Sequence, residues 1–446
     1  MKDRLTLDVW LDGAPIPAGK LVSLENGNTT FSYSPDYLAQ RERPISLSLP
    51  LREETFGDLS TRAFFGNLLP ENDQIQQFRE GNGLEVSDIV GLLYYLGADC
   101  PGAISCMPAG SGPAKIPGRL TDDYVPLRDA EIIEIMVQLA DNRRLPPTTK
   151  DPSPLAGVQG KIAITVLPDG QWALPRPDAK VPTTHILKVP RREEAGDVHL
   201  EAAACRLARD VGFSASVPLA VSYADRQGLL ITRFDRDVKD GIVRRIHQED
   251  FTQALGLATS AKYQRRGQPG RCFDAATIAA LLNRTAQPAL ARETFLLWTI
   301  FNLAVGNTDN HGKNHAVLYT GGEVPYLAPL YDILPIRLSD KYTHELAYTI
   351  GAANFAADLS PQDFATFFDL FGLSKAAQVR FITRRIAPLL ARLDEVAGAL
   401  PGIGLKTFDD FLGGETARLA DILKLKIPFR ERDYFVARGG GWLAGS

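Results

Sequence analysis

One segment restricts the fold of this 446-residue chain more than any other: an apolar stretch that runs directly into a polar loop. Residues 293–305, ETFLLWTIFNLAV, are apolar almost all round, which predicts a helix buried deep in a helical unit. Residues 306–314, GNTDNHGKN, are polar and carry a carboxylate, amides, an imidazole and a lysine. A buried structural helix seldom ends in this way. We therefore expect the helix to hold the loop in a fixed place, where its side chains do chemistry.

The composition is that of a globular protein and limits its partners. With 45% apolar residues the chain can bury a large core, and its length predicts two or three structural units. The 49 basic and 53 acidic residues leave a net charge of -4, which gives no overall field that attracts nucleic acid. The chain starts with alternating apolar and polar residues and has no long apolar run, so we expect a cytoplasmic protein that makes no membrane contact.

The spacing of apolar residues predicts a β-rich beginning and a helical end. Residues 5–11 alternate in polarity before the turn signal Asp12-Gly13, which is typical of strands. Residues 108–118 are dense in proline and glycine, which predicts a linker. Strand patterns recur at 161–167, 184–190 and 228–234, and helical spacing dominates beyond about residue 245, except for a strand signal near 315–319.

The polar loop and three residues outside it have the side chains that phosphoryl transfer requires. Asp309 and Asn314 have the D-x-x-x-x-N spacing of a kinase catalytic loop, in which Asp accepts the hydroxyl proton and Asn binds a metal ion. Asp332 is a candidate for the second metal carboxylate. Lys188, in an apolar strand, resembles the lysine that contacts the α- and β-phosphates, and Glu201 on the next helix is available to hold it.

A glycine-containing segment before the second set of strands is a candidate phosphate loop. Residues 155–161, LAGVQGK, match neither G-x-G-x-x-G nor the P-loop pattern, which disfavours a P-loop NTPase. Ala156, Gly157 and Gly160 would still let backbone N–H groups approach phosphate oxygens, with Lys161 adding charge. An ordinary tight turn between strands explains this segment equally well.

Seven motifs together make the chain resemble the HipA family, the serine/threonine kinases of bacterial toxin-antitoxin pairs. They are FFGNLLPE at 64–71, LAGVQGK at 155–161, HILKVP at 185–190, RFDR at 233–236, HQEDF at 247–251, GNTDNHGKN at 306–314 and LYDILP at 330–335. The resemblance implies an α+β, protein-kinase-like, two-lobed fold. Its expected parts are a β-rich N-terminal subdomain (1–110), a linker and connecting helix (111–150), a nucleotide-binding lobe (151–240) and a large all-helical catalytic lobe (241–446).

The resemblance also implies a role for each candidate residue, with ATP and Mg²⁺ as cofactors. Asp309 is the expected base, Asn314 and Asp332 the Mg²⁺ ligands, and Lys188 an ATP contact. We assign a phosphate contact to Lys313. The full nucleotide site comprises the loop Ala156, Gly157, Val158, Gln159, Gly160 and Lys161; Thr232, Arg233 and Phe234 near the adenine; and His311, Gly312, Lys313, Asn314, Tyr331 and Asp332.

The partners implied by the resemblance are a helix-turn-helix antitoxin dimer of the HipB type, operator DNA bound through that antitoxin, and a protein substrate with a Ser or Thr acceptor. Some family members phosphorylate a tRNA synthetase, and many corepress transcription with the antitoxin. One position departs from the family. A serine used for autophosphorylation commonly lies two residues before the Ala-Gly of the ATP loop, and here that position is Pro154. Whether the adjacent Ser153 replaces it stays open.

Other functional classes use some of the same residues. A small-molecule phosphotransferase of kinase-like fold would share Asp309, Asn314 and Asp332, although FFGNLLPE and a separate β-rich subdomain argue against it. A metal hydrolase would use Asp309, His311 and His315, but Gly312 and the loop setting spoil the helical spacing that would aim both imidazoles at one ion. A buried histidine at the start of a strand explains His315 better.

A catalytically silent corepressor is the third alternative. The stretch 379–385, VRFITRR, has the arginines to contact DNA phosphates directly through Arg380, Arg384 and Arg385. A solvated helix face explains such a run more simply.

Overall fold

The computed structural model describes residues 2–40, 43–71, 79, 82–85, 87–149, 160–177, 179–400 and 405–430. It contains both helix and sheet, 39% and 23% of the chain. The chain forms two compact units: Met1–Val198, Leu219–Thr259 and Val317–Pro325 make the first, and His199–Pro218, Ser260–Ala316 and Tyr326–Ser446 make the second. The boundaries of the four expected parts stay a prediction. Among the described residues, no helix is both long and apolar enough to cross a membrane.

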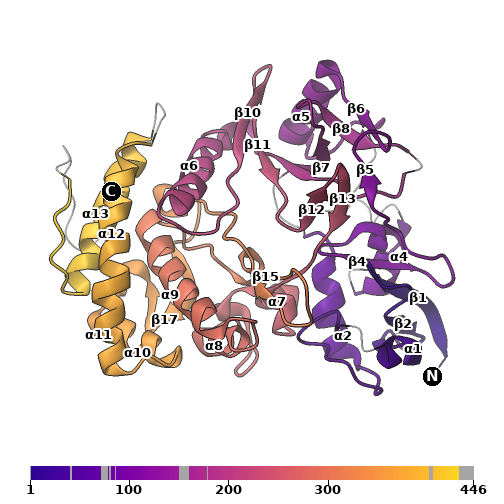
Figure 1. Ribbon diagram of the computed structural model, residues 1–446, viewed down its shortest axis with the longest axis horizontal. Coiled ribbons are helices and arrows are strands. Elements are labelled where there is room, and N and C mark those ends of the chain that lie inside the picture. The colour runs from indigo at the N-terminus through magenta and orange to yellow at the C-terminus, as the bar shows by residue number, and fades with distance from the viewer. Residues whose placement is uncertain are drawn as a thin grey trace. The chain divides into compact units, whose positions relative to one another are not determined.

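The first unit begins with a four-stranded antiparallel sheet in the order β3-β2-β1-β4 (Figure 1). Its alternating side chains put Leu7, Val9 and Phe31 on the inner face, where all three are fully buried. Three helices contribute Tyr37, Phe64, Phe65 and Leu92 among other residues to the same core. The elements are β1 (Asp3–Leu11), β2 (Gly19–Leu24), β3 (Thr29–Tyr33), β4 (Ile104–Pro108), α1 (Pro35–Ala39), α2 (Asp58–Phe65) and α4 (Ile89–Leu96).

A second, six-stranded antiparallel sheet in the same unit has the order β10-β11-β9-β7-β8-β6. Helix α5 (Asp129–Asn142) packs on it, with Ile132, Met136 and Leu139 against Ile162 and Leu187 of the strands (Figure 1). The strands are β6 (Tyr124–Pro126), β7 (Gly160–Val166), β8 (Trp172–Pro175), β9 (His185–Val189), β10 (Leu219–Tyr223) and β11 (Arg226–Thr232). The strand patterns at 161–167, 184–190 and 228–234 correspond to β7, β9 and β11.

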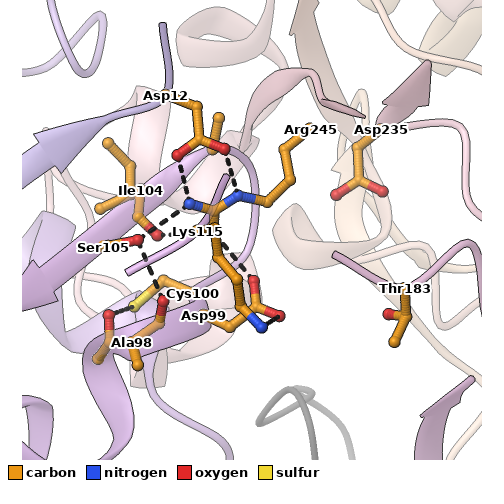
Figure 2. Close-up of polar contacts among 12 residues, drawn as sticks. Asp12, Ala98, Asp99, Cys100, Ile104, Ser105, Lys115, Thr183, Asp235 and Arg245 are labelled. Atoms are coloured by element: carbon orange, nitrogen blue, oxygen red, sulfur yellow. Dashed lines mark hydrogen bonds and ion pairs between the residues drawn. The ribbon is translucent and has the colours of Figure 1, made fainter. Parts of the chain in front are cut away.

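A buried ion network ties the N-terminal sheet to a strand more than two hundred residues later. Arg245 ends β13 (Ile242–Arg245), which pairs with β12 (Arg236–Lys239) and β5 (Gly118–Arg119). Its guanidinium donates to both carboxylate oxygens of Asp12, at 2.5 and 2.7 Å, and to Asp99 at 2.9 Å (Figure 2). Lys115 lies 3.3 Å from the other oxygen of Asp99. Burial alone would raise the pKa of Asp99, but the Lys115 and Arg245 charges lower it, so this carboxylate stays ionised.

A buried carboxyl makes a second long-range link inside the first unit. Glu249, in β14 (His247–Asp250), is 1% exposed. It accepts hydrogen bonds from the Ser46 hydroxyl at 2.5 Å, the Leu47 N–H at 2.9 Å and the Tyr319 hydroxyl at 2.6 Å. Burial outweighs these three donors and raises the pKa of Glu249 to about 7. Glu249 of the HQEDF motif therefore holds the Ser46–Leu47 turn in place through these hydrogen bonds. The structure gives this motif a role in packing.

The second unit is mainly helical. Its helices include most of α6 (Gly196–Asp210), then α8 (Ala275–Leu282), α9 (Pro288–Val305), α10 (Pro361–Leu370), α11 (Lys375–Phe381), a π-helical turn η9 (Ile382–Ile386), α12 (Ala387–Ala397) and α13 (Lys406–Ile422) (Figure 1). A hairpin of β17 (Glu345–Ile350) and β18 (Ala353–Phe355) lies among them. Helix α7 (Phe251–Ala254) belongs to the first unit.

The expectation that 241–446 is all-helical is wrong. This range contains β13, β14, β17 and β18, and also β15 (Ala316–Tyr319) and β16 (Tyr326–Leu327). In β17 the buried residues are Leu346, Ala347, Tyr348 and Ile350, a short apolar run that does not distinguish a strand from a helix. Gly351, with φ of 62°, turns the chain back within two residues and selects the hairpin instead.

We predict that Glu249→Gln removes a specific pH dependence of stability. The carboxyl has a pKa near 7 when folded and about 4.5 when unfolded, so protonation favours the folded state. Its contribution is fully present below pH 4.5 and is lost as the pH rises through 7, a change on the order of 3 kcal/mol. Glutamine resembles the neutral carboxyl. Urea unfolding at pH 5 and pH 8 should show a smaller pH effect in the variant than in the parent.

Glu249→Ala is the matched control, because it removes the acceptor for all three donors. This variant should be less stable than the parent at both pH values. Equal pH slopes for the parent and Glu249→Gln would contradict the assigned pKa.

Candidate active site

The candidate active site begins where helix α9 ends. Nearly every side chain from Phe295 to Val305 is buried, as the apolar sequence predicted. Gly306 terminates the helix with φ of 76°, and its N–H donates to the carbonyls of Asn302 and Leu303. A Cβ atom at Gly306 would lie 2.6 Å from Cε1 of Phe411, so both the backbone conformation and the space require glycine. The polar loop therefore leaves the helix in one fixed direction.

Hydrogen bonds inside the loop hold it in one conformation. The Asn307 amide donates to Oδ1 of Asn302 at 2.9 Å, and the Asp309 N–H donates to Oδ1 of Asn307 at 3.3 Å. The backbone carbonyl of Asp309 accepts from the His311 N–H at 2.9 Å and from Nδ2 of Asn314 at 2.9 Å. Because Asn314 donates through its nitrogen, this bond does not use its oxygen Oδ1, which has the chemistry of a cation ligand.

A second layer of contacts supports the loop from the core. Asn310 Nδ2 donates to the Tyr348 hydroxyl at 3.3 Å, which in turn lies 2.9 Å from Oγ1 of Thr299 on α9. His315 Nε2 lies 3.2 Å from the Asn310 carbonyl oxygen. The His315 ring is 2% exposed and burial lowers its pKa to about 4, so it is a neutral core histidine as expected. It contributes to packing.

Asp309 has the electrostatic environment of a general base. Its Oδ1 accepts a hydrogen bond of 2.6 Å from the Tyr263 hydroxyl. Burial raises the pKa of Asp309, and the nearby negative charge of Asp332 raises it further, against the lowering effect of Tyr263 and Lys262. A raised pKa makes a carboxylate a better proton acceptor near neutral pH.

Tyr263 is a site residue that the sequence did not reveal. It lies between two short 3-10 turns, η4 (Thr259–Lys262) and η5 (Gln264–Arg266), and 46 positions before Asp309. Its ring packs edge-on against His311 at 5.0 Å, and the Arg265 guanidinium lies 4.3 Å from its centroid. The one sequence feature that could have indicated a site here is the cluster of cations around Tyr263 in residues 262–266, KYQRR.

Asp332 is held in a backbone conformation that side chains rarely adopt. Its φ is 56°, in the left-handed region, where a residue other than glycine is strained. Such strain is found most often at functional sites. The preceding Tyr331 anchors the segment by donating its hydroxyl to the Lys313 carbonyl at 2.7 Å. The structure thus brings Asp309, Asn314 and Asp332 together in the second unit, with His311, Gly312 and Lys313 in the same loop.

The donor set fits Mg²⁺ but not a zinc-type site. Among the described residues, no group of three or more His, Cys, Asp or Glu side chains could hold a metal ion. Mg²⁺ instead binds one or two protein oxygens together with phosphate oxygens and water. The Asn314 amide oxygen and the Asp332 carboxylate have that chemistry, and the repulsion that Asp332 exerts on Asp309 favours a cation nearby.

The phosphate-binding candidates of the first unit lie on its six-stranded sheet. Lys188 in β9 and Lys161 in β7 are directly paired across the two strands, so both side chains project from the same face. Lys188 is 6% exposed. Two ammonium groups on one face of the sheet have the charge that contacts with phosphate oxygens require.

Some of the remaining predicted nucleotide-site residues have contacts in the structure, and others lie outside the described residues. The hydroxyl oxygen Oγ1 of Thr232 lies 3.1 Å from Nε2 of His185. The Arg233 guanidinium is buried and donates twice to Asp235, at 2.9 and 2.8 Å, so its side chain has a structural partner. Phe234 is half-buried. Ser153, Pro154, Ala156, Gly157, Val158 and Gln159 lie outside the described residues. The predicted Lys188–Glu201 pair joins the two units and stays a prediction.

Comparison with known proteins gives consistent matches along the chain. Residues 7–107 match the HipA N-terminal domain, and residues 153–395 match the HipA-like C-terminal domain. Y4mE of Sinorhizobium fredii, which is named as a kinase, is 35% identical over 93% of this chain and 94% of its own length. The serine/threonine-protein kinase toxin HipA of Shewanella oneidensis is 28% identical over 89% of this chain and 90% of its own.

A solved structure gives the same result for the fold. The Shewanella oneidensis HipA in complex with HipB and operator DNA superimposes with a TM-score of 0.77 at 25% identity, covering 94% of this chain and 98% of that one. The fold is thus that of a HipA protein, kinase-like with mixed helix and sheet. With both domain matches and a relative at 35% identity along nearly its whole length, the chain belongs to the HipA family.

Proposed function

We propose that this protein is a serine/threonine protein kinase that uses ATP and Mg²⁺. The observation that carries the proposal is the environment of Asp309, a half-buried carboxylate with a raised pKa that accepts a hydrogen bond from Tyr263. Asn314 and Asp332 supply oxygens beside it. The kinase names of relatives along almost the whole chain support the same activity.

In the proposed mechanism, Asp309 orients a Ser or Thr hydroxyl and accepts its proton as that oxygen attacks. The Tyr263 hydroxyl already donates to Oδ1 at 2.6 Å, which is the interaction that an acceptor hydroxyl would make with this carboxylate. ATP would supply the γ-phosphoryl group and leave as ADP, and bound Mg²⁺ would neutralise charge on the phosphate oxygens. Asn314 and Asp332 would hold the metal ion, while Lys188 and Lys161 would contact the phosphates. His311 is neutral, because burial lowers its pKa to about 3, and it packs against Tyr263.

We further propose that the kinase is the cytoplasmic toxin of a toxin-antitoxin pair. A helix-turn-helix antitoxin dimer of the HipB type would silence it and recruit it to operator DNA as a corepressor. The similar Shewanella oneidensis structure contains HipB and operator DNA, which supports this pairing. The protein substrate would carry a Ser or Thr acceptor, and a tRNA synthetase is the first candidate because some family members phosphorylate one.

Asp309→Asn should abolish most phosphate transfer and leave ATP binding in place. Asparagine keeps the shape but cannot accept the proton, so we expect turnover to fall ~10²–10⁴-fold. The measurement is transfer of label from γ-labelled ATP with Mg²⁺ into proteins of a bacterial lysate. Asp358→Asn, at an exposed aspartate of the same unit, is the control and should keep the parent's labelling.

Turnover of Asp309→Asn within a few-fold of the parent would show that the base is assigned wrongly. ATP binding without any labelled protein, in the parent as well, would instead favour a small-molecule acceptor or a silent corepressor.

Tyr263→Phe should move the acidic limb of the rate-pH profile to higher pH. The Tyr263 hydroxyl stabilises the charged form of Asp309, so its loss raises the pKa of that carboxyl. Well above this limb the carboxylate is present in both proteins, and rates should agree within about tenfold. Tyr94→Phe removes an exposed phenol in the other unit and should leave the limb in place. A limb that does not move in Tyr263→Phe would mean that Asp309 is not the titrating base.

A further inference from the structure

A cavity of about 600 Å³ lies inside the second unit, apart from the residues assigned above. It is bounded by the first two-thirds of α9, the segment after α6, strand β16 and the junction of η9 with α12. Its volume is within the range of about 300–1,000 Å³ that is typical of small-molecule sites. The cavity is therefore large enough for an organic ligand of ordinary size.

The inner wall of the cavity is apolar and contains one unpaired donor. Leu297, Trp298 and Leu389 are buried side chains that line it, and the exposed Leu290 and Tyr326 extend the apolar surface to its edge. Trp298 is 3% exposed, and its indole N–H has no acceptor among the described residues. This N–H is closed to solvent, so Trp298 contributes apolar surface to the wall.

One face of the Trp298 ring packs against another side chain of the core. The ring stacks on His315, with ring centroids 6.2 Å apart and planes at 14°. This contact fixes the indole ring, so the wall of the cavity is preformed. Trp298 lies in helix α9, and the polar loop 306–314 follows directly from the end of that helix. One helix therefore carries both a wall of the cavity and the candidate active-site loop.

The outer part of the cavity is cationic. Arg384, Arg385 and Arg392 line it, and its lining includes no acidic side chain. Arg385 pairs with Glu293 at 2.5 Å and Arg392 with Glu395 at 2.8 Å, while Arg384 has no ion pair among the described residues. Among the described residues, Arg384 therefore keeps a positive charge without a carboxylate partner, and an anion is the ligand that would pair with it.

The backbone around the consecutive residues Arg384 and Arg385 is unusual, and both residues line the cavity. They lie in the π-helical turn Ile382–Ile386 between α11 and α12. Such turns are rare and are frequent at functional sites. Arg380, one turn earlier, is exposed but does not line the cavity. The stretch 379–385 is thus not a uniform basic helix face.

We propose that this cavity binds a small amphipathic anion. Its flat apolar body would lie against Leu297 and Trp298, and its anionic group would pair with Arg384 and Arg385. A charge-assisted pair at the outer end and apolar burial at the inner end together distinguish this ligand class from neutral molecules and from simple inorganic anions.

The test compares two fluorescent probes that differ only in charge. The anion 8-anilinonaphthalene-1-sulfonate and the neutral N-phenyl-1-naphthylamine share one aromatic body, and the sulfonate alone can pair with arginine. We expect saturable binding of one anionic probe per chain, at least about tenfold tighter than the neutral probe. Arg384→Gln/Arg385→Gln should weaken binding of the anion about tenfold and leave that of the neutral probe unchanged. Both changed residues are exposed, so folding should be unaffected.

Two controls complete the test. Arg380→Gln removes a neighbouring exposed arginine and should leave the affinity for both probes unchanged. Trp298→Phe should remove most of the tryptophan quenching that accompanies binding of the anionic probe, because Trp298 is the one tryptophan among the described residues that line the cavity. Equal affinities for the two probes, or an equal effect of Arg380→Gln and the double variant, would overturn the proposal. The assay contains no nucleotide, so its result does not depend on whether the chain is a kinase.

Discussion

The burial of helix α9 is the constraint on which the rest of the second unit depends. Phe295, Trp298 and Phe301 each remove a large apolar surface from water, which stabilises the helix by on the order of 2–3 kcal/mol per side chain. The helix must end where Gly306 allows the left-handed conformation beside Phe411. The polar loop that follows is then positioned by packing, and its side chains need not order themselves when a substrate arrives. Preorganisation of this kind is a main source of catalytic rate.

Like charges placed near one another are the second recurring feature. In the second unit, Asp332 lies close enough to Asp309 to raise its pKa. In the first unit, Lys161 and Lys188 are paired across neighbouring strands. In each unit, a ligand of the opposite charge would be attracted to these groups.

Local patterns in the sequence were sufficient for the elements nearest the site. The all-apolar run predicted α9, and the change to polar residues predicted the loop with Asp309 and Asn314. Short apolar runs of strand type predicted β7, β9 and β11. The hairpin at Gly351 was missed, because the short apolar run of β17 does not distinguish a strand from a helix. That ambiguity is inherent in short apolar segments.

Long-range contacts were not predictable from the sequence. The hydrogen bond from Tyr263 to Asp309 spans 46 positions, and the ion pair between Arg245 and Asp12 spans 233. Neither pair has a spacing that periodicity can detect, since tertiary packing alone brings the partners together. The left-handed backbone of Asp332 is likewise imposed by the surrounding fold, because aspartate has no strong preference for it.

We propose that Asp309 accepts the proton of the substrate hydroxyl, and that Asn314 and Asp332 bind the metal ion. Titration calorimetry of ATP with and without Mg²⁺ tests this division of roles directly, because it needs no protein substrate. The account predicts that Mg²⁺ tightens ATP binding in the parent and in Asp309→Asn, and that Asp332→Asn loses this enhancement. Retention of the Mg²⁺ effect in Asp332→Asn, or its loss in Asp309→Asn, would contradict the account.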